Sequence, residues 1–238
     1  MAGKGTRLSK IGNCKPAIKV CGRAICQWCL QSISKHLLKG DHLIVITTEY
    51  FEINFSIKKL IRETISYLNL DIDFDLLLVK NTPPGPAATV SYAKSHIKNN
   101  EKTIIVNCDQ FCDFKFPEVG KEWDAFIPIT FNSNGSSSYV RLKKNKIIQV
   151  AEKKLISNYA TIGVYGFNNP DILFSLIQDA LNGPAHYKNE YFVAPIFEKL
   201  ISSNKIILPT ETYAKYDLGN IEGINNFKKT FNYFEFEK

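Results

Sequence analysis

The sequence predicts an α/β fold with a mixed, mainly parallel central sheet that helices cover on both faces. In the first half, short apolar runs rich in branched residues alternate with segments of helical periodicity. Such alternation is typical of parallel strands joined by helical crossovers. Longer apolar runs follow residue 120, and Lys144-Asn145 suits the turn of a hairpin. The sequence therefore predicts one domain over 1–238, with halves at about 1–115 and 116–238.

The expected elements follow in order along the chain. The segment 24–38 has helical periodicity and is followed by Gly40, a residue that often ends helices. Pro170 and Gly183 bound a later helix in the same way. The pattern predicts helices over 24–38, 55–70, 170–183, 189–203 and 221–231, and a turn leading into a helix over 83–97. It predicts strands over 42–50, 75–81, 102–110, 123–131, 139–154 (as a hairpin), 159–167, 205–211 and 213–218.

Composition is that of a water-soluble globular protein. Hydrophobic residues make up 45% of the 238 residues and charged residues 22%. No apolar run reaches the length of a membrane span, and no apolar signal region opens the chain. We therefore expect a cytoplasmic protein with no membrane partner.

The net charge of +7 limits the kinds of partner. The lysines are scattered in singles and doublets, without the basic run that is typical of nucleic-acid binding. An anionic small substrate or a merely solvated basic surface explains the charge equally well. We expect no nucleic-acid partner, and the sequence does not predict the oligomeric state.

The six cysteines include the cluster CGRAICQWC at residues 21–29. Cys26 and Cys29 lie three apart on an expected helix, so a metal or redox site is one interpretation. No second Cys or His pair follows at ligand spacing. The sequence favours buried, reduced thiols in a reducing cytoplasm.

Three polar clusters are candidate ligand sites, because ligands of open α/β sheets bind at the carboxyl ends of strands. They are the opening loop, 82–87 and 107–110. In the opening loop, Gly3 and Gly5 allow backbone amides to turn toward an anion, and Arg7 and Lys15 add positive charge. The Gly-x-Gly spacing alone also fits a plain surface turn.

Two carboxylates end expected strands. Asp109 follows TIIV, and Asp217 ends YAKYD. A carboxylate at a strand end suits Mg²⁺, which takes few protein ligands and shares its shell with phosphates and water. A helix-capping aspartate is an equally good interpretation of Asp109.

Taken together, these segments resemble the sugar-phosphate nucleotidyltransferases. The resemblance lies in MAGKGTRL with Lys15-Pro16, NTPPGPAATV, IIVNCDQFCDF, VAEKKLISNYATIGVYGF, NEYFVAPIF and YDLGNIEGINNF. It covers nearly the whole chain, with the segments in the family's order. The Asp-Gln that ends IIVNCDQ resembles the form of this segment in one capsule-sugar branch of the family. The resemblance implies a Rossmann-like three-layer sandwich.

The family resemblance also implies roles for individual residues. Those that would bind the nucleotide are Ala2, Gly3, Gly5, Arg7, Lys15, Gly85 and Ala87. Arg7, Lys15 and Asp109 would be catalytic, because they offset phosphate charge directly or through a metal.

On the same resemblance, Asp109 and Asp217 would hold Mg²⁺. Glu152 would contact sugar hydroxyls, and Lys153 would hold the substrate phosphate. The implied reaction transfers a nucleoside monophosphate from a nucleoside triphosphate to a sugar-1-phosphate, with release of pyrophosphate. The product would be an activated sugar for surface polysaccharide synthesis.

Three other functions fit parts of the sequence. One is a glycosyltransferase that uses a nucleotide-sugar donor, for which the Asp-x-Asp form of DIDFD at 71–75 is relevant. That segment precedes an expected strand instead of ending one, which favours a solvated turn. The others are an inactive nucleotide-binding homologue and a basic nucleic-acid binder. Neither the base nor the acceptor is predicted by the sequence.

The sequence departs from the family in three places. Pro86 replaces a residue with an N–H, and Asn220-Ile221-Glu222-Gly223 replaces the usual Thr-Pro-Glu-Asp. The family has a buried strand before the glycine loop, and this first strand is missing from the chain. We expect from this that Met1 is an internal methionine and that upstream codons encode an apolar strand.

Overall fold

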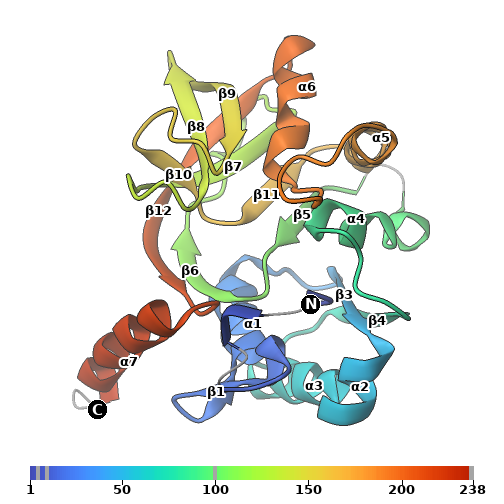
Figure 1. Ribbon diagram of the computed structural model, residues 1–238, viewed down its shortest axis with the longest axis vertical. Coiled ribbons are helices and arrows are strands. Elements are labelled where there is room, and N and C mark those ends of the chain that lie inside the picture. Colours follow the sequence, from blue (N-terminus) through green and yellow to red (C-terminus); the bar gives the residue numbers. More distant parts are fainter. Residues whose placement is uncertain (4–5, 9–10, 99–100, 236–238) are drawn as a thin grey trace. The chain divides into compact units, whose positions relative to one another are not determined.

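The computed structural model describes residues 1–3, 6–8, 11–98 and 101–235. The chain divides into two compact units (Figure 1). The first unit comprises Met1–Thr82, Asn107–Asp113 and Ala214–Lys238, and the second comprises Pro83–Val106 and Phe114–Tyr213. This division differs from the predicted halves, because 83–106 packs with the second unit and 214–238 with the first.

The first unit is built around a parallel pair of strands, β3 (His42–Thr48) and β4 (Asp73–Val79), in register from His42↔Asp73 to Thr48↔Val79. Its helices are α1 (Ile25–Ile33), α2 (Glu49–Phe55), α3 (Ile57–Tyr67) and α7 (Ile221–Glu235). The short strands β1 (Lys19–Val20) and β2 (Arg23–Ala24) form a hairpin. Three-residue 3₁₀ turns lie at Thr6–Leu8, Lys15–Ala17 and Ser34–His36.

Local capping corrects two of the predicted boundaries in the first unit. The side chain of Thr48 accepts a hydrogen bond from the Phe51 N–H, so the strand ends there and α2 begins at Glu49. Ser56 has a φ of +50° and separates α2 from α3; the helix predicted over 55–70 corresponds to α3, and α2 was not predicted. The predicted solvated turn at 71–75 is wrong in part, since Asp73 and Asp75 belong to β4.

The larger sheet has the strand order β5-β11-β7-β10-β8-β9. Its strands are β5 (Thr103–Val106), β7 (Ala125–Phe131), β8 (Ser138–Lys143), β9 (Lys146–Glu152), β10 (Tyr159–Thr161) and β11 (Val164–Phe167). Strand β12 (Ile207–Asp217) runs parallel to β7 and also pairs with β6 (Gln110–Phe114). The predicted hairpin turn is confirmed, because Lys144 and Asn145 adopt positive φ between β8 and β9.

The mixed α/β fold is therefore confirmed, but the sheet is less parallel than predicted. Among the pairs with a described register, β3–β4 and β7–β12 are parallel, and those around β5, β8, β9, β10 and β11 are antiparallel. For β8 and β9 the physical reason is the tight turn at Lys144-Asn145, which joins the two strands directly and leaves no room for a crossover helix. The described residues before Lys19 contain no strand.

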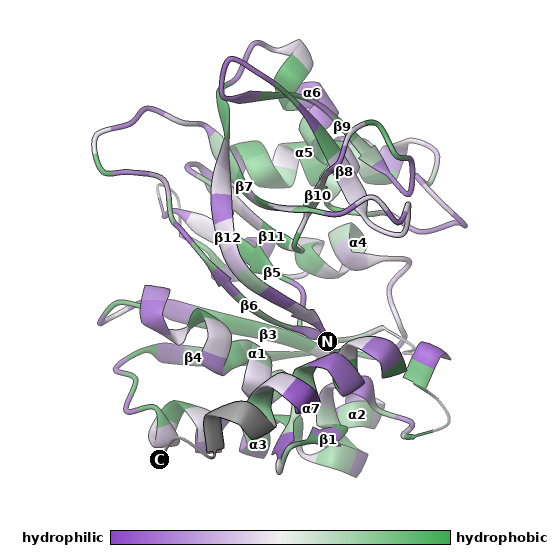
Figure 2. Cartoon of the chain, turned by 90° about the vertical axis from the view of Figure 1, so that its left-hand side faces the viewer, coloured by the Kyte–Doolittle hydropathy of each residue, from purple (hydrophilic) through white to green (hydrophobic). Residues whose placement is uncertain are grey.

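Helices of the second unit are α4 (Pro86–Ser91), α5 (Pro170–Asn182) and α6 (Phe197–Ser202), with 3₁₀ turns at Lys94–His96 and Ala194–Ile196. Helix α5 buries Leu173, Phe174 and Ile177, and it is mostly green in Figure 2, whereas α7 shows much purple. The predicted helix over 189–203 is shorter, because the 3₁₀ turn Ala194–Ile196, which contains Pro195, precedes α6. The two strands predicted over 205–218 form the single strand β12.

Cysteines of the first unit lie mostly in its interior. Cys14, Cys26, Cys29 and Cys112 are buried free thiols, as predicted. Burial raises the pKa of Cys14 to about 11 and that of Cys26 to about 12, so these thiols stay protonated. Within the described part of the chain, no helix is both long and apolar enough to cross a membrane.

Candidate active site

Two carboxylates of the first unit converge. Asp109 lies between β5 and β6, and Asp217 is the last residue of β12. A Cβ placed on Gly219 would lie 2.5 Å from Asp109 Oδ2 and 2.9 Å from Asp217 Oδ1. The two oxygens therefore both lie against the Gly219 backbone, and only glycine, which has no Cβ, allows so close an approach. The sequence predicted both strand ends, and the structure brings them together.

Asp217 is held by hydrogen bonds from the residues that follow it. The Gly219 N–H donates to Oδ1 at 2.8 Å, and the side-chain amide of Asn220 donates to Oδ2 at 2.6 Å. Each carboxylate oxygen thus has one fixed donor and keeps lone pairs for a further ligand.

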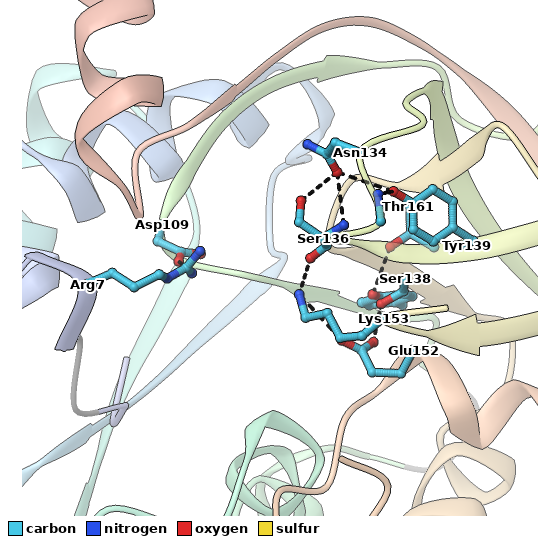
Figure 3. A network of polar contacts seen from close by, with 11 residues as sticks. Arg7, Asp109, Asn134, Ser136, Ser138, Tyr139, Glu152, Lys153 and Thr161 are labelled. Carbon is cyan, nitrogen blue, oxygen red and sulfur yellow. Dashed lines mark hydrogen bonds and ion pairs between the residues drawn. The ribbon is translucent and has the colours of Figure 1, made fainter. Parts of the chain in front are cut away.

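Asp109 is paired with two cations of the first unit. Lys15 Nζ donates to Asp109 Oδ2 at 2.7 Å, and Arg7 lies 4.0 Å from the same oxygen (Figure 3 shows Arg7 and Asp109). Burial by itself would raise the pKa of Asp109, but the charge and hydrogen bond of Lys15, with the charge of Arg7, hold that pKa below its usual value. Asp109 is therefore an ionised carboxylate.

The segments that carry Lys15 and Asp109 are fixed by local structure. Lys15 begins a 3₁₀ turn whose second residue, Pro16, is buried. The Cys29 thiol donates to the carbonyl of Asn107 at 3.3 Å and holds the loop that leads to Asp109. Lys15 keeps only 17% of its side chain exposed, and Arg7 keeps 62%. Lys15 is thus the fixed cation of the pair and Arg7 the accessible one.

The opening loop is anchored at Met1 and at Leu8. Met1 donates its terminal amino group to the Ile46 carbonyl at 2.6 Å, and Leu8 is fully buried. Ala2 is buried, whereas Gly3 is exposed, with nothing within 4 Å of a Cβ placed on it. Gly5, which the sequence also predicts to bind nucleotide, lies outside the described residues.

The donor set suits a divalent cation that takes few protein ligands. Within the described ranges, no group of three or more His, Cys, Asp and Glu residues is placed to hold a metal. Two carboxylates that approach the same glycine backbone fit Mg²⁺, which takes few protein ligands and completes its shell with water and substrate phosphates.

A second polar cluster lies in the second unit, around Glu152 at the end of β9 (Figure 3). Ser138 donates a hydrogen bond to Glu152 Oε2, and Lys153 Nζ lies 3.7 Å from Oε1 while it donates to the Ser136 carbonyl. Burial raises the pKa of Glu152, since its side chain is only 5% exposed, against the opposing effects of Ser138 and Lys153. The cluster joins a buried acceptor to a partly exposed cation.

The segment predicted to meet the base is built against Tyr191 in the second unit. Gly85 has a φ of +107°, and a Cβ there would lie 2.5 Å from the Tyr191 backbone N and O. The Ala87 N–H donates to the Tyr191 carbonyl at 2.9 Å, and Ala87 is fully buried. Glycine at 85 is therefore required by the neighbouring backbone, which the sequence pattern did not reveal.

The structure adds residues that the sequence analysis did not single out. Gly219, Asn220 and Ser138 contact the predicted carboxylates directly. A sequence signal existed for the first two, because a strand-end aspartate followed by Gly-Asn suits a turn that folds back on the carboxylate. No comparable signal marked Ser138.

Comparison with known proteins places the chain in a family. The model of the nucleotidyl transferase family matches residues 1–231. The chain therefore belongs to the nucleotidyl transferase family, which confirms the resemblance seen in the sequence. A search of curated proteins gives no match.

Solved structures share the fold at low sequence identity. A nucleoside-diphosphate-sugar pyrophosphorylase from Vibrio cholerae RC9 has a TM-score of 0.83 and 20% identity, over 96% of this chain and 98% of that one. A UDP-glucose pyrophosphorylase complexed with UDP-glucose has a TM-score of 0.73 and 17% identity, over 100% of this chain and 97% of that one. The inositol-1-phosphate CTP transferase from T. maritima has a TM-score of 0.72 and 15% identity, over 93% of this chain and 88% of that one.

Proposed function

We propose that the chain transfers a nucleoside monophosphate from a nucleoside triphosphate to a sugar-1-phosphate. The observation that carries the proposal is the convergence of Asp109 and Asp217 beside Gly219, with Lys15 and Arg7 on the same carboxylate. Family membership and the three pyrophosphorylase and transferase folds support this class of reaction.

The reaction needs charge neutralisation more than proton transfer. An oxygen of the sugar phosphate would attack the α-phosphorus of the triphosphate, and the bond to the bridging oxygen would break to release pyrophosphate. The nucleophile is already anionic, so no general base is required. Both reactants are anions, and Arg7 and Lys15 would offset their repulsion and align the phosphates.

Asp109 and Asp217 are the residues that would hold Mg²⁺. The ion would supply positive charge to the phosphate oxygens on which negative charge increases. Lys15 would then leave Asp109 Oδ2 and turn its ammonium group to the triphosphate.

The Glu152 cluster would bind the acceptor. A buried carboxylate that accepts from Ser138 can also accept from a sugar hydroxyl, and the partly exposed ammonium group of Lys153 suits the acceptor phosphate. Two proteins of similar fold are a UDP-glucose pyrophosphorylase and an inositol-1-phosphate CTP transferase, which supports a polyhydroxy acceptor.

We place the product in surface polysaccharide synthesis, because IIVNCDQ resembles the capsule-sugar branch. A cytoplasmic location fits the nucleoside triphosphate substrate and the buried free thiols.

The test measures pyrophosphate release while five nucleoside triphosphates are crossed with a panel of phosphorylated sugars, polyols and amino alcohols. The expected result is release with one triphosphate and one sugar-1-phosphate, dependent on Mg²⁺. Gly219→Ala should abolish release, because its Cβ would overlap both carboxylates. Transfer of a sugar from a nucleotide-sugar, or no release with any pair, would contradict the proposal.

A further inference from the structure

We infer that Asn220 is a positioning residue for Asp217, and thereby for the metal of the proposed function on which this inference rests. The residue lies between β12 and α7 and contacts the carboxylate through its side-chain amide, at 2.6 Å from Oδ2. It does not belong to the set that the sequence analysis selected, and it replaces the usual threonine of the family.

The Asn220 side chain makes two hydrogen bonds of opposite polarity. Its Nδ2 donates to Asp217, and its Oδ1 accepts from the Gly223 N–H at 2.8 Å. The Asn220 carbonyl also accepts the first helical bond, from Ile224 at 3.1 Å. Asn220 is therefore the N-cap of α7, and the cap fixes the direction in which its amide points.

Gly223 makes this arrangement possible. A Cβ placed on Gly223 would lie 1.8 Å from the Asp217 carbonyl oxygen, so the first turn of α7 packs directly on the backbone of the metal-binding candidate. Serine and threonine side chains can cap a helix but are too short to provide the amide donor. The combination of Asn220 and Gly223 thus lets one side chain cap α7 and donate to Asp217 at the same time.

The donor should matter for metal affinity. With the Gly219 N–H on Oδ1 at 2.8 Å and the Asn220 amide on Oδ2, the carboxylate is held in one orientation before a cation arrives. Hydrogen-bond partners of metal ligands typically change metal affinity by about 10- to 100-fold when they are removed. Helix capping without the amide should leave the fold intact and the carboxylate free to rotate.

The experiment measures Mn²⁺ binding by electron paramagnetic resonance, without nucleotide, together with the melting temperature of each protein. Asn220→Ser and Asn220→Thr keep a capping oxygen and remove only the amide, while Asn220→Ala removes both. Asn225→Ser, at an exposed position of the same helix, is the matched control. We expect Mn²⁺ to bind about tenfold more weakly to all three Asn220 variants, and only Asn220→Ala to melt clearly lower.

The outcomes separate this inference from the proposed function. Wild-type affinity in Asn220→Ser and Asn220→Thr would overturn the positioning role and leave the metal site standing. Failure of the wild-type protein to bind Mn²⁺ would overturn the metal site and the positioning role with it. A loss in Asn225→Ser equal to that in Asn220→Ser would assign the effect to the helix instead of the amide.

Discussion

The first unit and the second unit each place a carboxylate beside a lysine, yet the two carboxylates differ in pKa. Asp109 receives a hydrogen bond from Lys15 at 2.7 Å, and its pKa is lowered against the effect of burial. Glu152 Oε1 lies 3.7 Å from Lys153 Nζ, which donates a hydrogen bond to the Ser136 carbonyl. Burial raises the pKa of Glu152. A lysine in the neighbourhood is therefore not sufficient. Lys15 and Arg7 together outweigh burial at Asp109, whereas burial outweighs Ser138 and Lys153 at Glu152.

The difference suits the two proposed tasks. An ionised carboxylate at Asp109 can exchange its ammonium partner for a metal ion. A carboxylate at Glu152 that is stripped of water is a stronger hydrogen-bond acceptor for a neutral hydroxyl than one in solvent.

The largest expected effect comes from Asp109→Asn, which removes the charge that Lys15 and the metal share. Pyrophosphate release should fall by about a thousandfold or more, because the proposed metal ion loses one of its two carboxylate ligands. Steady-state assays at saturating Mg²⁺ measure it, with circular dichroism as the test of folding. Asp113→Asn is the control, since Asp113 lies on β6 and pairs with the exposed side chain of Lys35. Equal turnover in the two variants would refute the metal assignment.

Next in size is the effect of Lys15→Ala, which tests the exchange of partners at Asp109. Lys15 occupies Oδ2, so its removal should strengthen Mn²⁺ binding without nucleotide by about tenfold and raise the KM for the triphosphate. Electron paramagnetic resonance and steady-state kinetics measure the two quantities. Lys153→Ala should leave Mn²⁺ binding unchanged. Weaker Mn²⁺ binding in Lys15→Ala would show that the lysine supports the ion instead of competing with it.

Arg7→Ala and Lys153→Ala should then divide the two substrates. Arg7 contacts the Asp109 side of the first unit and Lys153 the Glu152 cluster of the second. We expect Arg7→Ala to raise mainly the KM for the triphosphate, and Lys153→Ala mainly that for the sugar phosphate, each by about tenfold. Kinetics with one substrate varied at a time measure both. If the two variants weakened the same substrate, one of the two roles would be wrong.

The smallest expected effect is on stability, in Glu152→Gln. The pKa of Glu152 in the folded protein lies above the ordinary value of 4.5. At a pH above the folded-state pKa, ionisation of Glu152 therefore lowers the free energy of unfolding. This cost vanishes at a pH below the pKa of the unfolded state. Glutamine should therefore raise the melting temperature at pH 7 and lose this advantage near pH 4. Thermal melts at both pH values measure it, with exposed Glu63→Gln as control. A gain that is independent of pH would contradict the burial effect.

Local patterns in the sequence predicted much of the fold. Apolar periodicity and turn chemistry gave the alternation of helices and strands, the hairpin at Lys144-Asn145, and the position of Asp109 just after β5. The matching segments also indicated the family that the family model confirms. Each of these signals depends on residues close together in the chain, where backbone preferences act directly.

What only the tertiary structure decided depends on contacts between distant segments. Periodicity carries no information on whether Asp109 and Asp217 meet, which follows from contacts between segments that are far apart in the chain. The need for glycine at 85 and 219 comes from the Tyr191 backbone and from the two carboxylates. The opposite pKa shifts of Asp109 and Glu152 likewise depend on how deeply each carboxylate is buried and on which cations the fold brings to it, and no local pattern encodes either.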